Sequence, residues 1–282
     1  MLNKKEKQEF VFLLKRAFRE DCVYNDITSK ALYPSRFVKA RIVSGGNYCL
    51  AGADALADIF SARSKTTKVK VLKKDGSPLT CRAIVCEIEG SAGMIFSAER
   101  VALNFLSFLS GIASKTRALK EIIDKNWRSP RKPVLLDTRK TLPGFRYLSK
   151  YAVRCGGGVN HRFDLEDTAM VKDNHIAYAG LDFAIVAFRG KKVIFEADDL
   201  ASAKKILAVK PYVLLCDNFS PRQAAEASAL RDSVSPRTLI ELSGGIDEKT
   251  ILKYKRIPID RISSGALTHS APAADFSLEV YG

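Results

Sequence analysis

The sequence has few of the residues that form disulfide bonds or bind metals. Its 282 residues include three histidines, one tryptophan and six cysteines, and no C-x-x-C pair occurs. In a chain of this length, scattered cysteines predict reduced, mostly buried thiols and argue against a disulfide framework or a zinc site. The six are Cys22, Cys49, Cys81, Cys86, Cys155 and Cys216.

Several sequence motifs of enzymes are also missing. The chain has no P-loop, G-x-G-x-x-G fingerprint, nucleophile elbow or H-E-x-x-H, so kinase, dehydrogenase, serine hydrolase and zinc peptidase hypotheses lack their usual support. The longest apolar stretch, Val101 to Ala113, contains polar residues and is too short to span a bilayer. Residues 1–20 alternate charged and apolar residues at helical spacing, unlike a signal peptide. We therefore expect a soluble, cytoplasmic protein.

Negative charge is in short supply. Lysine and arginine number 46 against 31 aspartate and glutamate, which leaves a net charge of +15. Nucleic acid, an anionic membrane and phosphorylated metabolites would all suit such a charge, which alone does not choose among them. For outlying groups such as Lys68 to Lys74 and Lys253 to Arg256, a solvated surface is the simpler interpretation. The hydrophobic fraction of 46% is typical of a globular protein.

The first part of the chain predicts a small α+β unit. Between residues 37 and 89, hydrophobic residues recur with a period near two in the runs 38–43, 68–72 and 81–88. An apolar helix candidate, 50–63, lies between the first two runs. Strands around a helix indicate an α+β arrangement.

A long helix is predicted next, from Ala98 to about Asp124. Arg100 near its start is either an exposed helix charge or a side chain presented to a site.

The second part predicts repeated strand and helix units. Six short apolar runs each end in a polar or charged residue, with enough chain between them for one helix. Repeated βα units form a parallel sheet, and so many in series favour a closed or nearly closed barrel. The runs are Val134–Leu136 before Asp137, Ala169–Val171 before Lys172, Val193–Phe195 before Glu196, Val213–Cys216 before Asp217, Leu239–Leu242 before Ser243 and Arg261–Ser263 before Ser264.

Residues that follow these strands would be neighbours, because the carboxyl ends of barrel strands meet at one face. Glycines after the two late strands leave backbone N–H groups free to face phosphate oxygens. His161 beside Arg162 would be pushed toward its neutral form, although a structural role stays open. The donors are Thr138, Arg139, Lys140, His161, Arg162 and Lys172, and the two loops are Ser243, Gly244 and Gly245, and Ser264, Gly265 and Ala266.

Two carboxylates complete this set. Glu196 and Asp217 could hold Mg²⁺, directly or through ribose hydroxyls, since Mg²⁺ typically takes one or two carboxylates plus substrate oxygens. Each could equally be a capping or salt-bridging carboxylate at the barrel mouth.

Five segments carry a resemblance to a known family. Its motifs cover nearly the whole chain and also include Glu20-Asp21 to Thr28 and Glu99-Arg100 with Leu103-Asn104. The chain resembles quinolinate phosphoribosyltransferases. The five segments are Asp137-Thr138-Arg139-Lys140-Thr141 with Pro143-Gly144, Lys150 to Arg162 around Gly156-Gly157-Gly158, Val171 to His175, Leu242 to Ile246 and Gly265 to Pro272.

The resemblance implies an α/β fold with an incomplete, TIM-like α/β barrel at residues 106–270. An N-terminal α/β sandwich at 1–105 would be rejoined by the tail at 271–282. It also implies a homodimer or a larger assembly of dimers, such as a hexamer. The reaction would join quinolinate to phosphoribosyl pyrophosphate with Mg²⁺, giving nicotinate mononucleotide, pyrophosphate and CO2 for NAD biosynthesis.

Site roles also follow from the resemblance. Lys140, Glu196 and Asp217 would be catalytic, with the two carboxylates facing the ribose and the metal. Thr138, Arg139, Lys140, His161, Arg162 and Lys172 would surround the quinolinate carboxylates and nearby phosphates, and the loops at Ser243 and Ser264 would hold phosphates. Arg100 would reach into the neighbouring subunit's site.

Two alternatives stay open. A basic nucleic-acid-binding protein would spread its cations along a face with interleaved aromatics. Here the cations cluster at strand ends beside two carboxylates, so we expect neither a nucleic acid nor a membrane as partner. A transferase acting on nicotinate is the nearer alternative, and the number of cations favours a dicarboxylate.

Overall fold

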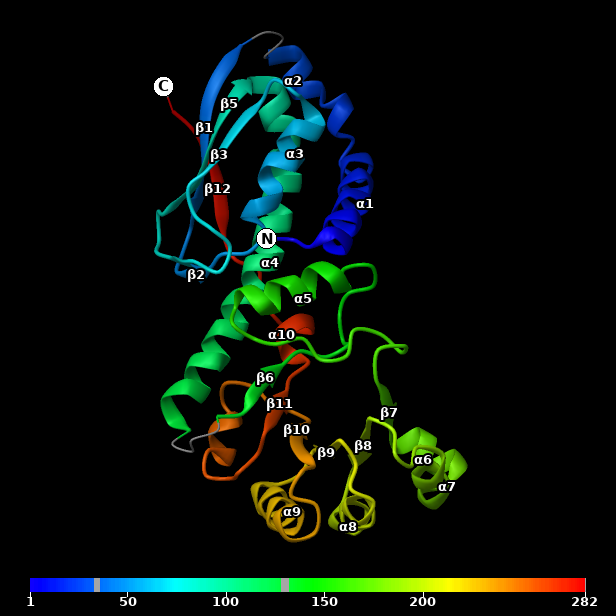
Figure 1. The fold of residues 1–282 in the computed structure, drawn as a ribbon. Coiled ribbons are helices and arrows are strands. Elements are labelled where there is room, and N and C mark those ends of the chain that lie inside the picture. Colours follow the sequence, from blue (N-terminus) through cyan, green and yellow to red (C-terminus); the bar gives the residue numbers. More distant parts are fainter. Residues whose placement is uncertain (33–35, 128–131, 282) are drawn as a thin grey trace. The chain divides into compact units, whose positions relative to one another are not determined.

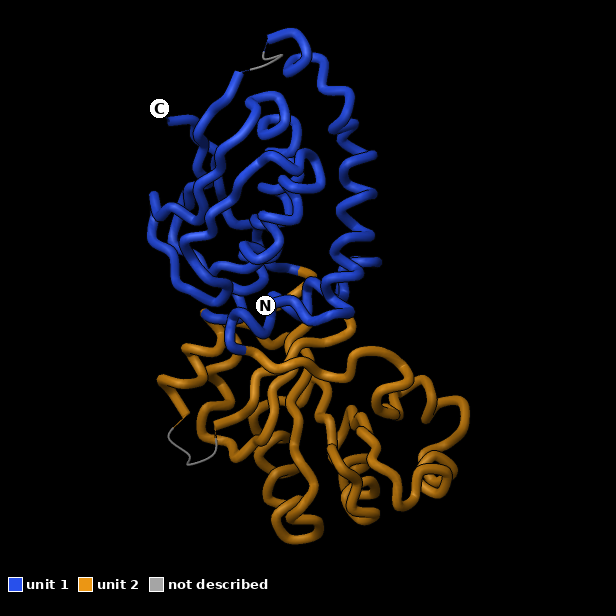
Figure 2. Tube along the Cα trace, turned by 45° about the horizontal axis from the view of Figure 1, so that its top comes forward, with its two compact units in different colours: residues 1–117, 141–157, 270–282 blue, residues 118–140, 158–269 orange. Residues whose placement is uncertain are grey.

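The computed structural model describes residues 1–32, 36–127 and 132–281 (Figure 1). The chain forms two compact units, coloured separately in Figure 2. The barrel range predicted from the sequence includes residues 106–117 and 141–157, which belong to unit 1 in the structure. Unit 1 comprises residues 1–117, 141–157 and 270–282, and unit 2 comprises 118–140 and 158–269.

A four-stranded antiparallel sheet organises unit 1, in the order β12-β1-β5-β3. Its last strand in the chain pairs with its first, so that Ile42 lies opposite Leu278. The tail therefore completes the N-terminal sheet. The strands are β1 (Phe37–Ser44), β3 (Lys68–Val71), β5 (Ile84–Ser91) and β12 (Phe276–Val280), and β2 (Tyr48–Cys49) pairs with β4 (Pro78–Leu79).

Helices cover this sheet, and local chemistry sets their limits. Helix α1 begins after a capping box in which Asn3 and Glu6 satisfy each other's backbone N–H groups. Its apolar residues at helical spacing, Phe10, Leu13 and Phe18, are buried. The helices are α1 (Lys4–Glu20), η1 (Val23–Asn25), α2 (Ile27–Leu32), η2 (Ala53–Ala55), α3 (Leu56–Arg63) and α5 (Arg146–Cys155).

Helix α4 (Ala92–Asn126) confirms the predicted long helix and extends it at both ends. By length and composition alone α4 could cross a membrane, but 56% of its most apolar window is buried within the protein. Leu106, Leu109 and Ile112 are among its buried residues. This is the pattern of a helix in the core of a protein.

Six parallel strands form the sheet of unit 2, in the order β6-β11-β10-β9-β8-β7. Among the described residues β6 and β7 do not pair, so the barrel is incomplete. All six predicted strands and the predicted fold class are confirmed. The strands are β6 (Val134–Leu136), β7 (Ala169–Val171), β8 (Val193–Ala197), β9 (Val213–Asp217), β10 (Leu239–Ser243) and β11 (Arg261–Ser263).

Helices follow most of these strands, and Figure 1 places α6 to α9 on one side of the sheet. Asp199 caps α8, and Ser220 with Gln223 forms a capping box at α9 ahead of Pro221. The helices are α6 (Asp173–Ala179), α7 (Leu181–Ala187), α8 (Leu200–Ala208), α9 (Pro221–Val234), η3 (Ile251–Tyr254) and α10 (Ala266–His269).

Strand alternation decides which side chains enter the barrel. Ile194, Val213 and Leu215 form a buried cluster, with Met170 and Leu239 packed against it. Successive side chains of a strand point to opposite faces, so residues two positions further along point the same way. Lys172, Glu196, Asp217, Glu241 and Ser243 therefore share the inner face with this cluster.

The cysteines agree with the prediction only in part. All six are free thiols. Cys49, Cys86 and Cys216 are buried and Cys155 is half-buried, whereas Cys22 and Cys81 are exposed.

Candidate active site

A cavity of about 510 Å³ lies at the carboxyl ends of the unit 2 strands. With the exception of Arg100, every predicted site residue lines it. Arg100 lies on α4 in unit 1 and is exposed. The predicted residues in the cavity wall are Thr138, Arg139, Lys140, His161, Arg162, Lys172, Glu196, Asp217, Ser243, Gly244, Gly245, Ser264, Gly265 and Ala266.

Asp137 positions the loop that supplies two of these residues. It is fully buried after β6, and its carboxylate accepts hydrogen bonds from Asn160 Nδ2 at 2.6 Å and from the His161 backbone N–H at 2.8 Å. Val159 also bridges to Leu136 of β6. These contacts bring His161 and Arg162 beside Arg139.

The guanidinium groups of Arg139 and Arg162 lie close enough in this cavity to repel each other. Burial, followed by repulsion from Arg139, lowers the pKa of Arg162 below its ordinary value. The buried Nε of Arg139 has no hydrogen-bond partner among the described residues. Crowded cations with a spare donor favour an anionic ligand, because its oxygens would satisfy the donor and offset the repulsion.

Lys172 and Glu196 form an ion pair, with Nζ 2.8 Å from Oε2. The Lys172 side chain is 43% exposed and that of Glu196 only 8%. The lysine head is thus held at the cavity wall by a buried carboxylate from the neighbouring strand.

Charge in the cavity is segregated by strand. Cations come from the β6 end, from the loop at Arg162 and from the β7 end, whereas carboxylates come from the strands between them. The expectation of a predominantly cationic set was therefore incomplete, because sequence inspection missed two further acids. The cavity carboxylates are Glu196, Asp217, Glu241 and Asp247.

Glu241 is the most consequential residue that sequence inspection missed. It is fully buried, and its Oε1 lies 3.1 Å from His161 Nε2 while its Oε2 lies 3.7 Å from Arg261 Nη1. The signal was a lone charge in the apolar run Leu239–Leu242, two residues before Ser243 and hence on the same strand face. His269 also lines the cavity, although spacing gave it no partner.

The glycine loops are shaped for a close approach of the backbone to a ligand. Gly244 has φ +91, and a Cβ there would meet the backbone N of Asn218 at 2.6 Å, so only glycine fits. Ser264, in contrast, donates its hydroxyl to Ile246 O and its backbone N–H to Leu136 O. These contacts hold the loop that presents Gly265, and a phosphate contact of the Ser264 loop stays a prediction.

A direct metal cage is not evident in the described part of the chain, where no three His, Cys, Asp or Glu side chains gather in a metal-binding arrangement. Asp217 accepts from Asn218 Nδ2 at 2.8 Å. Burial, together with repulsion from Asp173 and Asp217, raises the pKa of nearby Asp198. This concentration of carboxylates suits a cation that also takes oxygens from a substrate.

Family comparison covers nearly the whole chain. The model for the quinolinate phosphoribosyl transferase C-terminal domain matches residues 112–279, and the model for the N-terminal domain of the same family matches residues 26–110.

Relatives and solved structures agree. A probable nicotinate-nucleotide pyrophosphorylase [carboxylating] of Archaeoglobus fulgidus is 38% identical over 262 residues, which cover 91% of this chain and 98% of the relative. The human nicotinate-nucleotide pyrophosphorylase [carboxylating] is 37% identical over 214 residues, or 73% of this chain and 71% of the relative.

The Francisella tularensis nicotinate-nucleotide pyrophosphorylase structure aligns with a TM-score of 0.87 and 33% identity. The alignment covers 97% of this chain and 96% of that one. The predicted resemblance is confirmed, and the chain belongs to the quinolinate phosphoribosyl transferase family.

Proposed function

We propose that the cavity of unit 2 transfers a phosphoribosyl group from phosphoribosyl pyrophosphate to quinolinate. The products are nicotinate mononucleotide, pyrophosphate and CO2, which makes the chain a pentosyltransferase of NAD biosynthesis. The observation that carries the proposal is the pair Arg139 and Arg162, crowded in one cavity with an unpartnered donor. The two carboxylates of a dicarboxylate would accept hydrogen bonds from the two guanidinium groups and offset the repulsion between them.

The segregated charges divide the cavity between two substrates. Arg139, Arg162 and Lys172 bind the quinolinate carboxylates, and Lys140 with the Gly244 and Gly265 loops binds phosphate oxygens. Glu196 and Asp217 face the ribose hydroxyls. Two polyanions are thereby held next to each other at the mouth of one barrel, which removes much of the entropic cost of bringing them together.

Little proton chemistry is required of these residues. The pyridine nitrogen of quinolinate has a free lone pair, so it attacks the ribose carbon without a general base. The leaving pyrophosphate carries away negative charge, which fixed donors such as Lys140 stabilise as it develops. The bond from ring C2 to its carboxylate then breaks beside a ring nitrogen that has become cationic: CO2 leaves, the electron pair stays on C2, and a proton from solvent replaces the carboxylate.

Mg²⁺ fits the donor set at Glu196 and Asp217, with substrate oxygens completing its shell. When bound it would neutralise charge on the pyrophosphate. Chelation with EDTA should abolish turnover and added Mg²⁺ should restore it; full activity in EDTA would remove Mg²⁺ from the proposal.

Arg100 acts in a second subunit's cavity, so the active form is a homodimer or a larger assembly, and we place it in the cytoplasm. The test of function is direct. Purified protein is incubated with Mg²⁺, phosphoribosyl pyrophosphate and either quinolinate or nicotinate, and the product is resolved by chromatography. Nicotinate mononucleotide should form from quinolinate; formation from nicotinate alone would overturn the choice of acceptor.

A further inference from the structure

A second hollow lies at the end of the barrel strands opposite the active-site cavity. It has a volume of about 390 Å³ and is lined by residues that precede β8, β9 and β10 and by the end of α7. Parallel strands start at one edge and end at the other, so the proposed reaction does not explain this site. We call it the basal hollow, and its charged or aromatic lining comprises Phe188, Arg189, Lys191, Lys192, Lys210, Tyr212 and Arg237.

The basal hollow carries charge of one sign. Its described lining includes five cations and no carboxylate. None of the five takes part in an ion pair among the described residues, whereas cations elsewhere do: Lys39 lies 3.6 Å from Glu89, and Arg222 lies 2.9 Å from Glu226. Unpaired cations around a hollow raise the local concentration of anions.

The positions of two of these lysines are fixed, one by a ring contact and the other by its backbone conformation. Lys192 Nζ lies 4.4 Å from the centre of the Tyr212 ring, an attractive contact that fixes its head at the hollow. Lys210 has φ +54, a left-handed conformation in which glycine or asparagine would be less strained. Lys210 therefore adds a positive charge at the end of α8 in spite of an unfavourable backbone conformation.

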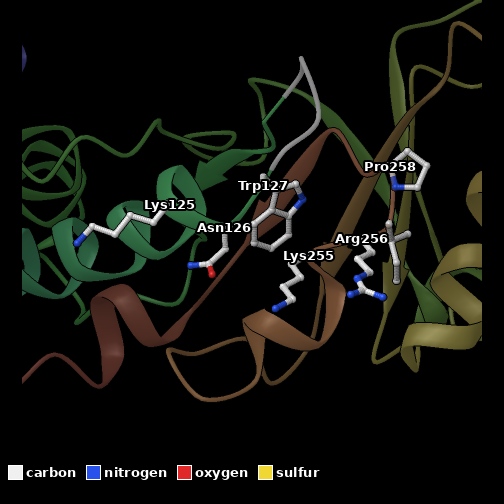
Figure 3. A pocket seen from close by; sticks show the side chains of 7 residues that line it. Lys125, Asn126, Trp127, Lys255, Arg256 and Pro258 are labelled. Carbon is white, nitrogen blue, oxygen red and sulfur yellow. The ribbon is translucent and has the colours of Figure 1, made fainter.

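Positive charge continues along the same edge. Figure 3 shows a further hollow, of about 470 Å³, in which Lys125, Lys255 and Arg256 lie around Trp127. These residues precede β6 and β11, and none of the described residues that line this hollow is acidic. The field at this end of the barrel therefore attracts anions from a wider region than the basal hollow alone.

A chain of polar contacts joins the basal hollow to the active-site cavity. Tyr212 OH accepts a hydrogen bond from Arg261 Nη2 at 3.1 Å. Arg261 Nη1 lies 3.7 Å from Glu241, and Glu241 lies 3.1 Å from His161. Each partner contacts the next, so a displacement of Tyr212 would move Arg261 and Glu241 and thereby change the position of the His161 ring.

We propose that the basal hollow binds a phosphate-bearing anion and that its occupancy is coupled to quinolinate binding through Tyr212, Arg261 and Glu241. An anion that pairs with Lys192 competes with the Tyr212 ring for the ammonium group. Arg261, whose guanidinium carbon lies 5.4 Å from the centre of the ring, is then the remaining cation at Tyr212. Its contact with the ring strengthens at the expense of its contact with Glu241. The coupling half rests on the proposed function, whereas the binding half does not.

Binding is tested by calorimetry in Arg139→Ala/Lys140→Ala protein, which impairs both the carboxylate and the phosphate contacts of the catalytic cavity. ADP should bind at one site per chain. In the further Lys192→Glu/Arg237→Glu variant its Kd should rise at least tenfold. The matched control Lys204→Glu/Lys205→Glu changes two exposed lysines of α8 that lie outside the lining and should bind as the parent does.

Absence of ADP binding, or equal weakening in the control, would overturn the site. Inorganic phosphate is titrated in parallel: similar affinities assign the site to the phosphate group, and tighter ADP binding assigns it to a nucleotide. Tighter binding of a single-stranded oligonucleotide that Lys192→Glu/Arg237→Glu abolishes would replace the small-anion proposal with a nucleic-acid surface.

Coupling is tested with the catalytic residues intact. ADP should change the KM for quinolinate at least threefold in wild type and not in Lys192→Glu/Arg237→Glu. Tyr212→Phe keeps the ring but loses the hydroxyl contact to Arg261, so it should retain ADP binding and lose the change in KM. An unchanged response in Tyr212→Phe would overturn the coupling and leave the binding site standing.

Discussion

The imidazole of His161 is oriented by Glu241 from the neighbouring wall of the barrel. His161 Nδ1 accepts the backbone N–H of Arg162 at 2.7 Å, so in the neutral ring the proton resides on Nε2. That nitrogen lies 3.1 Å from the buried Glu241 carboxylate. The nearby carboxylate favours the tautomer with its proton on Nε2.

Glu241 is therefore expected to act as a positioning residue. Glu241→Ala removes the carboxylate that lies 3.1 Å from His161 Nε2 and should lower kcat/KM for quinolinate roughly 10- to 100-fold, which corresponds to about 1.4–2.7 kcal/mol. Glu241→Gln keeps an acceptor and should recover most of this loss. Nitrogen NMR of His161 should show mixed tautomers in the alanine variant alone; a single unchanged tautomer there would contradict the assignment.

Arg139 and Arg162 are expected to be individually essential. Alanine at either position removes a charged donor that no neighbour replaces, and one such donor is typically worth about 10²–10³-fold in rate. Steady-state kinetics should show at least this loss while the thermal unfolding curve stays unchanged. Arg222→Ala is the matched control, because Arg222 is exposed and, in the part of the chain that the structure describes, forms an ion pair with Glu226 alone. Near-normal turnover in either active-site variant would show that its role was wrongly assigned.

Subunits that complement each other would support the proposed sharing of sites. Mixed assemblies of Arg100→Ala and Lys172→Ala chains contain one cavity with both residues intact, and in a two-fold dimer random mixing should restore about a quarter of wild-type activity. Differently tagged chains are purified in tandem to show that mixed dimers form. Inactive mixed dimers would argue against Arg100 acting in a partner's cavity.

The six thiols should differ in their reactivity according to their exposure to solvent. Burial raises the pKa of Cys86, Cys155 and Cys216 to about 12, so these groups stay protonated at neutral pH. DTNB should label two thiols quickly in the native protein and the rest only on unfolding. The fast phase should disappear in Cys22→Ser/Cys81→Ser, since these are the exposed pair; a persistent fast phase would mean that a core thiol opens to solvent.

Asp26 should contribute acid-sensitive stability. Its hydrogen bonds to the Ser29 hydroxyl, and to the backbone of Ser29 and Thr28, lower its pKa below 3.8. A lowered folded-state pKa means that the contribution is present above pH 3.8 and is lost as the pH falls through the folded-state value. Asp26→Ala should therefore cost about 1 kcal/mol at neutral pH, as for other helix caps.

Urea unfolding at several pH values measures this cost. The difference between wild type and Asp26→Ala should shrink on acidification, with Asp124→Ala on the exposed surface as control. A difference that does not depend on pH would point to packing in place of the carboxylate charge.

Sequence periodicity was a sound guide to the barrel, because each strand there is a short apolar run that ends where its carboxyl end meets solvent. The same reasoning assembled Thr138, Lys172 and Asp217 at one mouth. It failed at Glu241, since a charge inside an apolar run has no local signal of its partner across the barrel. It also gave no sign that the hydroxyl of Ser264 donates to Ile246 O and its backbone N–H to Leu136 O, contacts that only the folded chain reveals.

Contacts between distant segments of unit 1 also lack a local signal in the sequence. Arg154 pairs with the buried Glu6 at 2.8 Å, and Tyr151 OH donates to Asp75. Such contacts join segments far apart in the chain, and neither partner carries a local pattern that announces the other.

The pairing of β12 with β1 sets an order for folding during synthesis. Residues 37–44 leave the ribosome early, but their partner strand at 276–280 emerges only after every barrel strand has been made. Until then β1 has an unpaired edge, which is a template for wrong pairing with other chains. All strands of the barrel are thus made before the N-terminal sheet gains its outer strand, and the edge of β1 stays open to aggregation until then.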